Sequence, residues 1–241
     1  MALVIGATSD IGRAITRRLA AEMGVVQLAG RDVERLERDA PDIRVRTMAS
    51  VTVHRGAVRL RAGCVALANA LEPLADVAVC VVGALGDQAR AERDAQAAEE
   101  IIAVNYVGPA LLLGALAERF EARGAGTLVG VGSVAGDRGR ASNYVYGSAK
   151  AGFAAFLSGL RHRLAGKGVH VVTVKPGYVR TRMTDGMDLP DVLTAEPDEV
   201  ADAVLRAIRR RRGVVYVRRR WRLLMWVVRL IPERLFKRLS L

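Results

Sequence analysis

Tyr146 and Lys150 stand four residues apart in a stretch, residues 144–165, whose pattern predicts a helix. Side chains four residues apart lie on one face of a helix, so the phenol and the ammonium would meet. The pKa of a free tyrosine is about 10, too high for efficient proton exchange at neutral pH, and a nearby ammonium lowers it. The spacing therefore predicts a proton donor, Tyr146, tuned by Lys150. An ordinary helix-face pair is the alternative.

A glycine turn near the start of the chain is the second feature with chemical potential. It runs from Gly6 to Gly12, between an apolar run and a helical pattern over residues 11–23. Gly6 permits a tight turn, Gly12 permits close approach of the backbone to a ligand, and the helix N-terminus offers unpaired N–H groups to phosphates. The turn predicts a dinucleotide site, with a plain strand-to-helix connection as the alternative.

Asp10 stands in this turn at a position where a third glycine is usual. As an N-cap, its side chain would stabilise the following helix by about 1 kcal/mol. Alternatively, its carboxylate would stand beside an anionic ligand. The sequence leaves both interpretations open.

The end of the second apolar run bears on the choice of cofactor. Arg31 is well placed there to pair with the 2′-phosphate of NADP(H). Asp32, next to it, is placed to bind the ribose hydroxyls of NAD(H). The sequence favours NADP(H) and leaves NAD(H) as the alternative, together with the interpretation of Arg31 as a solvated residue at a helix start.

The elements that must position these residues alternate along the chain. Helical patterns separate the strand-like runs, and this order predicts a doubly wound, seven-stranded parallel α/β sheet, the Rossmann fold. At 241 residues the chain fits one such domain. We expect it over residues 1–217, with a basic tail over residues 218–241. The expected strands are residues 3–5, 25–29, 43–48, 77–82, 127–131, 169–174 and 214–217.

The net charge of +12 is concentrated in the tail region. Residues 206–241 hold 13 of the 37 lysines and arginines and one of the 25 acids, so the rest of the chain is neutral. Nucleic-acid binding would require basic residues on a docking element with aromatics that stack on bases. The arginines instead flank a short apolar segment, so we expect no nucleic-acid partner.

This tail has the composition of a helix at a membrane surface. Its apolar segment is far shorter than the ~20 residues needed to span a bilayer. Trp221 and Trp226 lie among arginines, which is typical of helices in an anionic membrane interface. Packing on its own domain or on a sister subunit is the equal alternative. Pro232 is expected to begin a second short helix.

Other residues argue for an intracellular protein without a metal site. Cys64 and Cys80 lie in apolar runs and are expected to be reduced packing thiols. The start of the chain lacks the pattern of a secretory signal. We therefore expect a cytoplasmic protein, peripheral at the inner face of the membrane if its tail binds there. The three histidines show no metal-ligand spacing, so no metal is expected.

Four features in this order resemble the short-chain dehydrogenase/reductase family: the glycine turn, Asn105, Gly132-Ser133 thirteen residues before Tyr146, and Lys175-Pro176-Gly177. The resemblance implies an NAD(P)-dependent enzyme that interconverts a carbonyl and an alcohol. It implies that Ser133 is a second hydrogen-bond donor to the substrate and that Tyr146 is the acid/base. Lys150 would also bind the nicotinamide ribose. Asn105 would hold a proton-relay water, or alternatively maintain a helix kink.

The same resemblance implies a set of cofactor contacts and a substrate loop over residues 178–197. It also implies a homo-dimer or tetramer. The end of the expected third strand, Met48-Ala49-Ser50, lacks the family's usual acid near the adenine, and Val81 to Ala84 lacks the usual Asn-Ala-Gly. The expected cofactor-binding residues are Gly6, Thr8, Ser9, Asp10, Ile11, Gly12, Arg31, Gly83, Tyr146, Lys150, Pro176, Gly177, Val179 and Thr181.

One branch of the family is more similar to this chain, the decaprenylphosphoryl 2-keto-pentose reductases. The similar stretches are residues 6–12, 83–87, 143–148, 180–183 and 231–237. The resemblance implies reduction of a lipid-linked keto-sugar. Two alternatives remain: a reductase of 3-oxoacyl chains or other small-molecule carbonyls, and a non-catalytic nucleotide-sensing protein that binds its partner through the tail.

Overall fold

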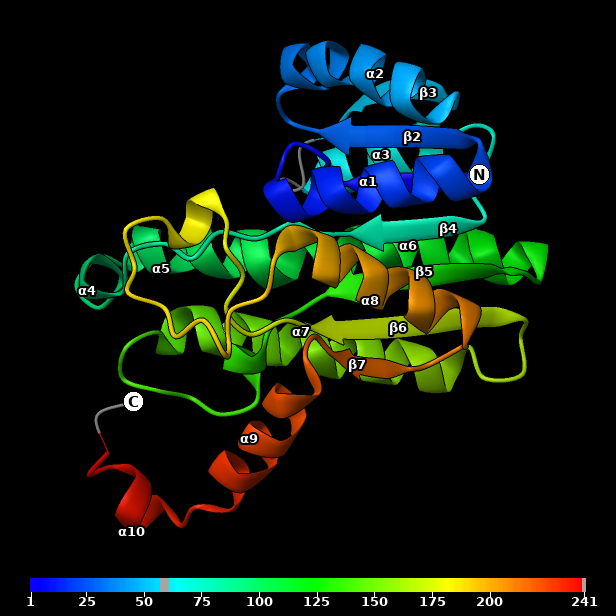
Figure 1. Ribbon diagram of the computed structural model, residues 1–241. Coiled ribbons are helices and arrows are strands. Elements are labelled where there is room, and N and C mark those ends of the chain that lie inside the picture. The colour runs from blue at the N-terminus through cyan, green and yellow to red at the C-terminus, as the bar shows by residue number, and fades with distance from the viewer. Residues whose placement is uncertain (57–60, 240–241) are drawn as a thin grey trace.

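The computed structural model describes residues 1–56 and 61–239. The strands found in them are β1 (Ala2–Ile5), β2 (Val25–Gly30), β3 (Ser50–Arg55), β4 (Val77–Cys80), β5 (Gly126–Val131), β6 (Val169–Lys175) and β7 (Val214–Tyr216). Within the described residues they form one parallel sheet of seven strands, in the order β3-β2-β1-β4-β5-β6-β7, which confirms the predicted Rossmann fold (Figure 1). The winding reverses between β1 and β4, where sheets of this kind bind ligands.

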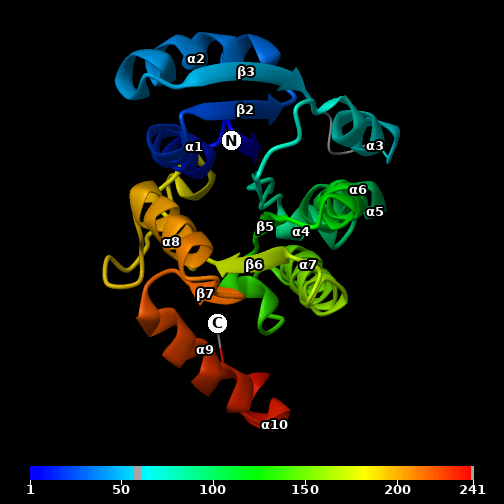
Figure 2. The same cartoon turned by 90° about the vertical axis from the view of Figure 1, so that its right-hand side faces the viewer.

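Helices cover both faces of the sheet, and each face has its own buried apolar cluster (Figure 2). On one face lie α1 (Asp10–Met23), α2 (Val33–Thr47) and α8 (Pro197–Arg209). On the other lie α3 (Arg61–Ala70), α6 (Gly108–Arg123) and α7 (Tyr144–Arg163). Because both faces are covered, the strands are continuous apolar runs rather than alternating ones.

The third strand was expected over residues 43–48, and this prediction is wrong. The helix α2 continues through Thr47, and β3 begins at Ser50. The buried residues Leu36, Ala40 and Ile43 recur at helical spacing, whereas the Val45 side chain is 78% exposed. The alternation of Ile43 and Val45 with arginines imitates a strand, but packing of the helix on the sheet decides the outcome.

One helical stretch, Ala95–Arg123, is long and apolar enough to cross a membrane by length and composition. It comprises α5 (Ala95–Ile102), a π-helical turn (Ala103–Val107) and α6. The α6 part buries Leu112, Leu116 and Phe120 in the core beneath the sheet. Its apolar composition is that of a crossover helix packed on a parallel sheet.

The tail forms α9 (Arg219–Leu230) and, after Pro232, the short α10 (Glu233–Phe236), which project from the β7 edge of the sheet (Figure 1). The inner face of α9 is buried: Trp221 is 4% exposed, and its Nε1 donates to the carbonyl of Leu193 at 2.8 Å. The outer face exposes Leu223, Trp226 and Leu230, each by more than 60%. The expected boundary between residues 217 and 218 falls between β7 and α9.

Candidate active site

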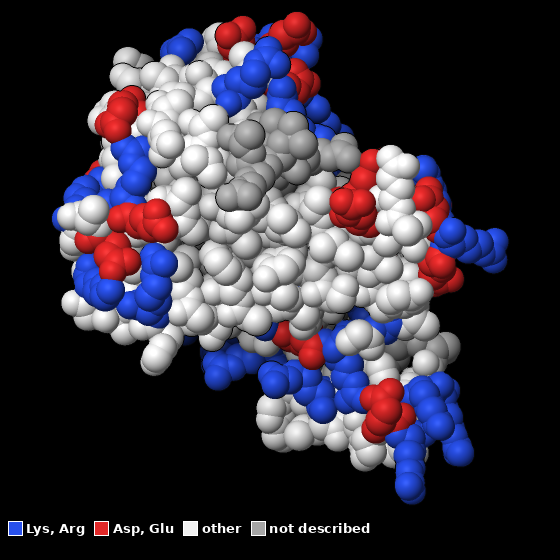
Figure 3. Space-filling view, turned by 180° about the vertical axis from the view of Figure 1, so that it is seen from behind, with Lys and Arg blue, Asp and Glu red and all other residues white. Residues whose placement is uncertain are grey.

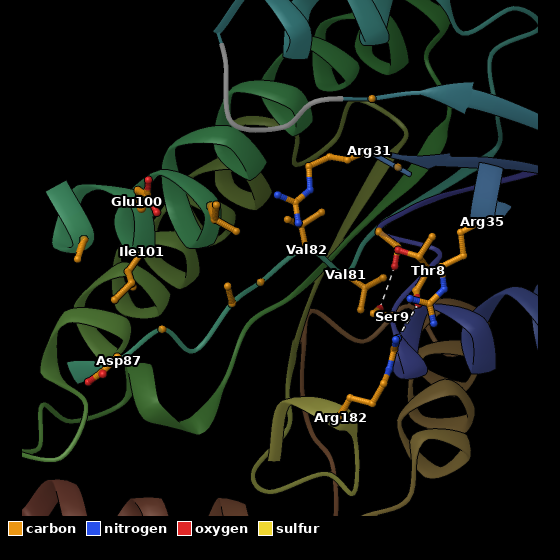
Figure 4. A pocket seen from close by; sticks show the side chains of 18 of the residues that line it. Thr8, Ser9, Arg31, Arg35, Val81, Val82, Asp87, Glu100, Ile101 and Arg182 are labelled. Atoms are coloured by element: carbon orange, nitrogen blue, oxygen red, sulfur yellow. Dashed lines mark hydrogen bonds between the residues drawn. The ribbon is translucent and has the colours of Figure 1, made fainter. Parts of the chain in front are cut away.

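Two adjoining cavities form a groove along the carboxyl ends of the strands. The first, of about 470 Å³, extends from the end of β3 to the end of β4 (Figure 4). The second, of about 270 Å³, extends from β4 to the segment after β6. The residues that line both cavities are Ser9, Val81, Val82, Gly83 and Arg182. The groove therefore lies at the reversal point of the sheet, and it includes part of the glycine turn, where the sequence predicted the dinucleotide.

The second cavity brings Ser133, Tyr146 and Lys150 together. Ser133 follows β5, where its Oγ accepts a hydrogen bond of 3.1 Å from the backbone of Ala135. Tyr146 lies in the first turn of α7, and its hydroxyl shares a hydrogen bond with the Ser133 side chain. Lys150 follows one turn later, with its Nζ 5.7 Å from the centroid of the Tyr146 ring. The three side chains face one space.

The Lys150 ammonium is buried, with only 3% of the residue exposed. Its Nζ donates to the carbonyls of Val82 and Val131, at 3.3 and 3.5 Å, and no carboxylate pairs with it among the described residues. Burial lowers the pKa of Lys150 to about 8, because a charge loses its hydration there. The ammonium is thus held at the floor of the cavity by main-chain dipoles.

The expected lowering of the Tyr146 pKa by Lys150 is not what the protein alone produces. Burial raises the pKa of Tyr146, and the hydrogen bond with Ser133 lowers it only in part. Lys150 directs its hydrogen bonds to the carbonyls of Val82 and Val131, at 3.3 and 3.5 Å, rather than to the phenol oxygen. In the protein alone, the phenol therefore stays protonated at neutral pH.

Asn105 lies in the π-helical turn between α5 and α6 and is fully buried. Its Nδ2 donates to the carbonyl of Ile101 at 2.8 Å and to that of Ala84 at 2.7 Å, while its Oδ1 accepts from the backbone of Ala84. These are the bonds of the structural, kink-maintaining role. Gly83 lies beside it, and a Cβ there would stand 3.0 Å from Asn105 Oδ1 and 3.1 Å from Lys150 Nζ.

The glycine turn has the conformation that a dinucleotide needs. Gly6 has a positive φ of 86°. A Cβ on Gly12 would lie 2.3 Å from the carbonyl oxygen of Gly6, so this glycine lets the helix pack beneath its own turn. That role differs from the expected one, since Gly12 lines neither cavity among the described residues. The exposed edge of the turn is formed by Thr8 and Ser9.

Ser9, and not Asp10, is the N-cap of α1, and its Oγ accepts from the backbone of Gly12 at 3.0 Å. Asp10 is the first helical residue, and both of its oxygens bond to Arg182. Burial alone would raise the pKa of Asp10, but its hydrogen bonds with Arg182 and the charge of Arg182 bring the pKa below its usual value. Asp10 therefore neither caps α1 nor stands as an unpaired charge, because it forms an ion pair with Arg182, 172 residues further along the chain.

The far end of the first cavity is cationic. Arg31 and Arg35 both line it, and Asp32 between them caps α2 by accepting from the backbone of Arg35 at 2.9 Å. Sequence reasoning missed Arg35, which lies in the first turn of α2, four residues after Arg31. The third strand ends at Arg55, and Gly56 after it lines the cavity, so the end of this strand is not the expected Met48-Ala49-Ser50.

Most of the expected cofactor-binding residues line this groove. Together with the N–H groups that begin α1, they fit a dinucleotide, because Arg31 and Arg35 stand at one end and the hydroxyls of Ser133 and Tyr146 with the Lys150 ammonium stand at the other. Those in the second cavity are Ser9, Asp10, Ile11, Gly83, Tyr146, Lys150, Pro176, Gly177, Val179 and Thr181.

Two comparisons with known sequences agree on the family of this chain. A family model described as short chain dehydrogenase matches residues 1–190. An uncharacterized oxidoreductase of Mycobacterium tuberculosis is 39% identical over 242 residues, which cover 98% of this chain and 96% of the relative. This relationship extends beyond the family match into the tail.

Solved structures agree with the sequence comparison. A short-chain dehydrogenase from Sphingobium yanoikuyae in complex with NADPH has a TM-score of 0.82 at 26% identity, covering 96% of both chains. A bulky-bulky ketone specific alcohol dehydrogenase from Comamonas testosteroni has a TM-score of 0.80 at 26% identity, covering 96% of this chain and 94% of that one.

Burial of the Lys150 ammonium should cost stability. Since burial lowers the pKa of Lys150 to about 8, the unfolded chain binds more protons than the folded one between pH 8 and the ordinary lysine pKa, and stability rises with pH there. Lys150→Met should therefore raise the free energy of unfolding of the cofactor-free protein by roughly 1 to 3 kcal/mol at pH 7. Urea denaturation measures the change.

Lys175→Met is the matched control, because Lys175 is also mostly buried but pairs with Asp137. It should destabilise the protein, since it leaves the buried Asp137 carboxylate without its cation and with only the Tyr216 hydroxyl as a side-chain partner. The gain from Lys150→Met should shrink as the pH approaches 10. A loss of stability at pH 7, or a gain that is independent of pH, would contradict burial of the charge as the cause.

Proposed function

Because this chain belongs to the short-chain dehydrogenase family and is an NAD(P)-dependent oxidoreductase, we propose that it uses NADPH to reduce a ketone to a secondary alcohol. The observation that carries the proposal is the meeting of Ser133, Tyr146 and Lys150 in the second cavity, at the end of the dinucleotide groove. A protonated phenol is the form that donates to a ketone, and burial, which raises the pKa of Tyr146, keeps this phenol protonated at neutral pH.

The residues of the second cavity divide the chemistry between them. Bound NADPH supplies the hydride that is added to the carbonyl carbon. The hydroxyls of Ser133 and Tyr146 donate hydrogen bonds to the carbonyl oxygen, and Tyr146 transfers its proton to that oxygen, which yields the alcohol. The ammonium of Lys150 stabilises the phenolate that remains, and it binds the nicotinamide ribose. The Asn105 side chain fixes the backbone of Ala84, and the proton-relay water that the resemblance implies would lie next to it.

NADPH is favoured over NADH by the charges at the far end of the first cavity. Arg31 and Arg35 offer two guanidinium groups to a 2′-phosphate, and such charge-assisted bonds are strong. Asp32 is engaged as the cap of α2, so it is less available to bind the ribose hydroxyls of NADH. The similar Sphingobium enzyme was solved with NADPH.

The substrate that we propose is a lipid-linked keto-sugar or a similar amphiphile. Two features support it: the resemblance to decaprenylphosphoryl 2-keto-pentose reductases, and an exposed amphipathic tail. Lysines and arginines gather over this tail around apolar side chains (Figure 3). We place the enzyme in the cytoplasm as a homo-oligomer, with the tail at the inner, anionic face of the membrane. Cofactor-oxidation assays with keto-sugar lipids and 3-oxoacyl esters test the substrate class.

Tyr146→Phe should lower the turnover number for ketone reduction at least about 100-fold, because the proton donor is lost. NADPH binding, measured by fluorescence titration, should stay within about threefold. Tyr144→Phe is the control, since Tyr144 is 45% exposed and lies two residues away from the cavity lining. Unchanged turnover in Tyr146→Phe would contradict the mechanism. NADPH binding by a wild-type protein without turnover on any ketone would instead favour the nucleotide-sensing alternative.

Arg31→Ser should weaken NADPH binding by about 10- to 100-fold and leave NADH binding nearly unchanged, because only NADPH carries the 2′-phosphate. Isothermal titration with both cofactors measures the ratio. Arg38→Ser, one turn beyond Arg35 and outside the lining of the groove, should change neither affinity. Equal losses for both cofactors would show that Arg31 does not select between them.

Replacing Leu223, Trp226 and Leu230 together by serine should abolish co-sedimentation with phosphatidylglycerol vesicles, because it removes the apolar outer face of α9 while Trp221 and Met225 keep the helix packed. Binding of the wild-type protein should weaken as salt is added. Equal partitioning of both proteins would contradict the membrane contact. Dissociation of a wild-type oligomer by the same replacement would assign this face to a sister subunit.

A further inference from the structure

Arg182 lies where the two cavities of the groove meet. It begins the short 3₁₀ turn Arg182–Thr184, in the segment that connects β6 to α8, and it lines both cavities. Figure 4 shows its guanidinium directed at the glycine turn, next to Ser9. A dinucleotide with its adenosine in the first cavity and its nicotinamide in the second has its diphosphate at this junction. Arg182 therefore stands where two negative charges would lie.

Asp10 holds Arg182 at two points. The backbone N–H of Arg182 donates to Asp10 Oδ2 at 2.9 Å, and Nε donates to Oδ1 at 3.1 Å. Nη2 donates to the carbonyl of Thr8 at 3.0 Å. Among the described residues, Nη1 has no protein partner. The side chain is 54% exposed, so its outer edge remains open to a ligand.

The charge balance explains an acid at an anion-binding turn. A carboxylate at the start of α1 opposes a bound diphosphate, because both are negative. Arg182 neutralises this carboxylate, and the pKa of Asp10 lies below its usual value, so the pair stays ionised. The guanidinium can bond to Asp10 along one edge and to a phosphate along another, since it has five donors in a planar fork.

We propose that Arg182 is the diphosphate clasp of this enzyme, anchored by Asp10, and that it closes residues 178–195 over the bound dinucleotide. The proposal rests on dinucleotide binding and not on the identity of the ketone. The same segment supplies Val179, Thr181 and Thr184 to the second cavity, so its position also shapes the substrate site. In this scheme Arg182 is a cofactor-binding residue, because it contacts the diphosphate, and Asp10 is the positioning residue that acts through it.

The test compares two ligands with and without the diphosphate, NADPH and adenosine 2′-phosphate. Arg182→Gln should weaken NADPH binding by about 10- to 100-fold and leave adenosine 2′-phosphate binding unchanged, as measured by calorimetry. Arg180→Gln is the matched control, since Arg180 is in the same segment but pairs with Asp191 and Glu196 and lines neither cavity. Equal losses for both ligands, or no loss for NADPH, would overturn the proposal.

The effect of Asp10→Asn on NADPH binding distinguishes two roles of Asp10: anchoring Arg182, or only repelling the diphosphate. If Asp10 only opposed the diphosphate, its neutralisation would tighten NADPH binding. As the anchor of Arg182, its loss should instead weaken NADPH binding by about 3- to 10-fold. Tighter binding would therefore refute the anchoring role.

Hydrogen exchange supplies a readout that needs no turnover. Saturating NADPH should slow amide exchange over residues 178–195 in the wild-type protein, and clearly less in Arg182→Gln at equal saturation. Equal protection in both proteins would rule out closure by Arg182. A wild-type protein that binds neither NADPH nor NADH would defeat the proposed function itself, and this result is distinct from a failure confined to the Arg182 variant.

Discussion

The buried ammonium of Lys150 is the constraint around which the groove is built. A charge with 3% exposure needs partners, and here they are the carbonyls of Val82 and Val131, at the carboxyl ends of the neighbouring strands β4 and β5. Parallel strands bring these carbonyls to one edge of the sheet. A Cβ on Gly83 would stand 3.1 Å from the ammonium and would have to displace it by a few tenths of an ångström. The buried charge of Lys150 thus accounts for the orientation of two strand-end carbonyls and for the small residue beside them.

The π-helical turn at Asn105 also helps to position the chain around Gly83, beside the Lys150 ammonium. A π-turn disrupts the regular helical ladder, and the Asn105 amide bonds to the carbonyl of Ile101, one turn earlier. The same amide holds Ala84 through two hydrogen bonds, at 2.7 and 3.2 Å, which fixes the chain just after Gly83. A helix irregularity and a strand end are therefore joined by one side chain. These hydrogen bonds link the π-turn to the chain segment that lines the first cavity.

The sequence predicted those features of the fold and the site that depend on residues close together in the chain. The glycine turn, the spacing of Tyr146 and Lys150, and the alternation of strands and helices depend on short stretches of chain. The third strand was misplaced because Ile43 and Val45 alternate with arginines, and only packing shows that Ile43 belongs with Leu36 on a helix face. The partner of Asp10 lies 172 residues away, and no local pattern connects the two.

The charge of the C-terminal tail suggests a separate segment, whereas its packing shows that α9 is part of the domain. By charge, residues 206–241 separate from a neutral body, but by contact the inner face of α9 packs behind the wall of the groove. A Cβ on Gly177 would lie 1.9 Å from the Trp221 ring, and Gly177 lines the second cavity. Trp221 also packs edge-on against Tyr178 at 5.4 Å and bonds to Leu193. The helix α9 thus lies between its exposed outer face and the segment that lines the second cavity, so the tail is packed against the groove and is not a separate appendage.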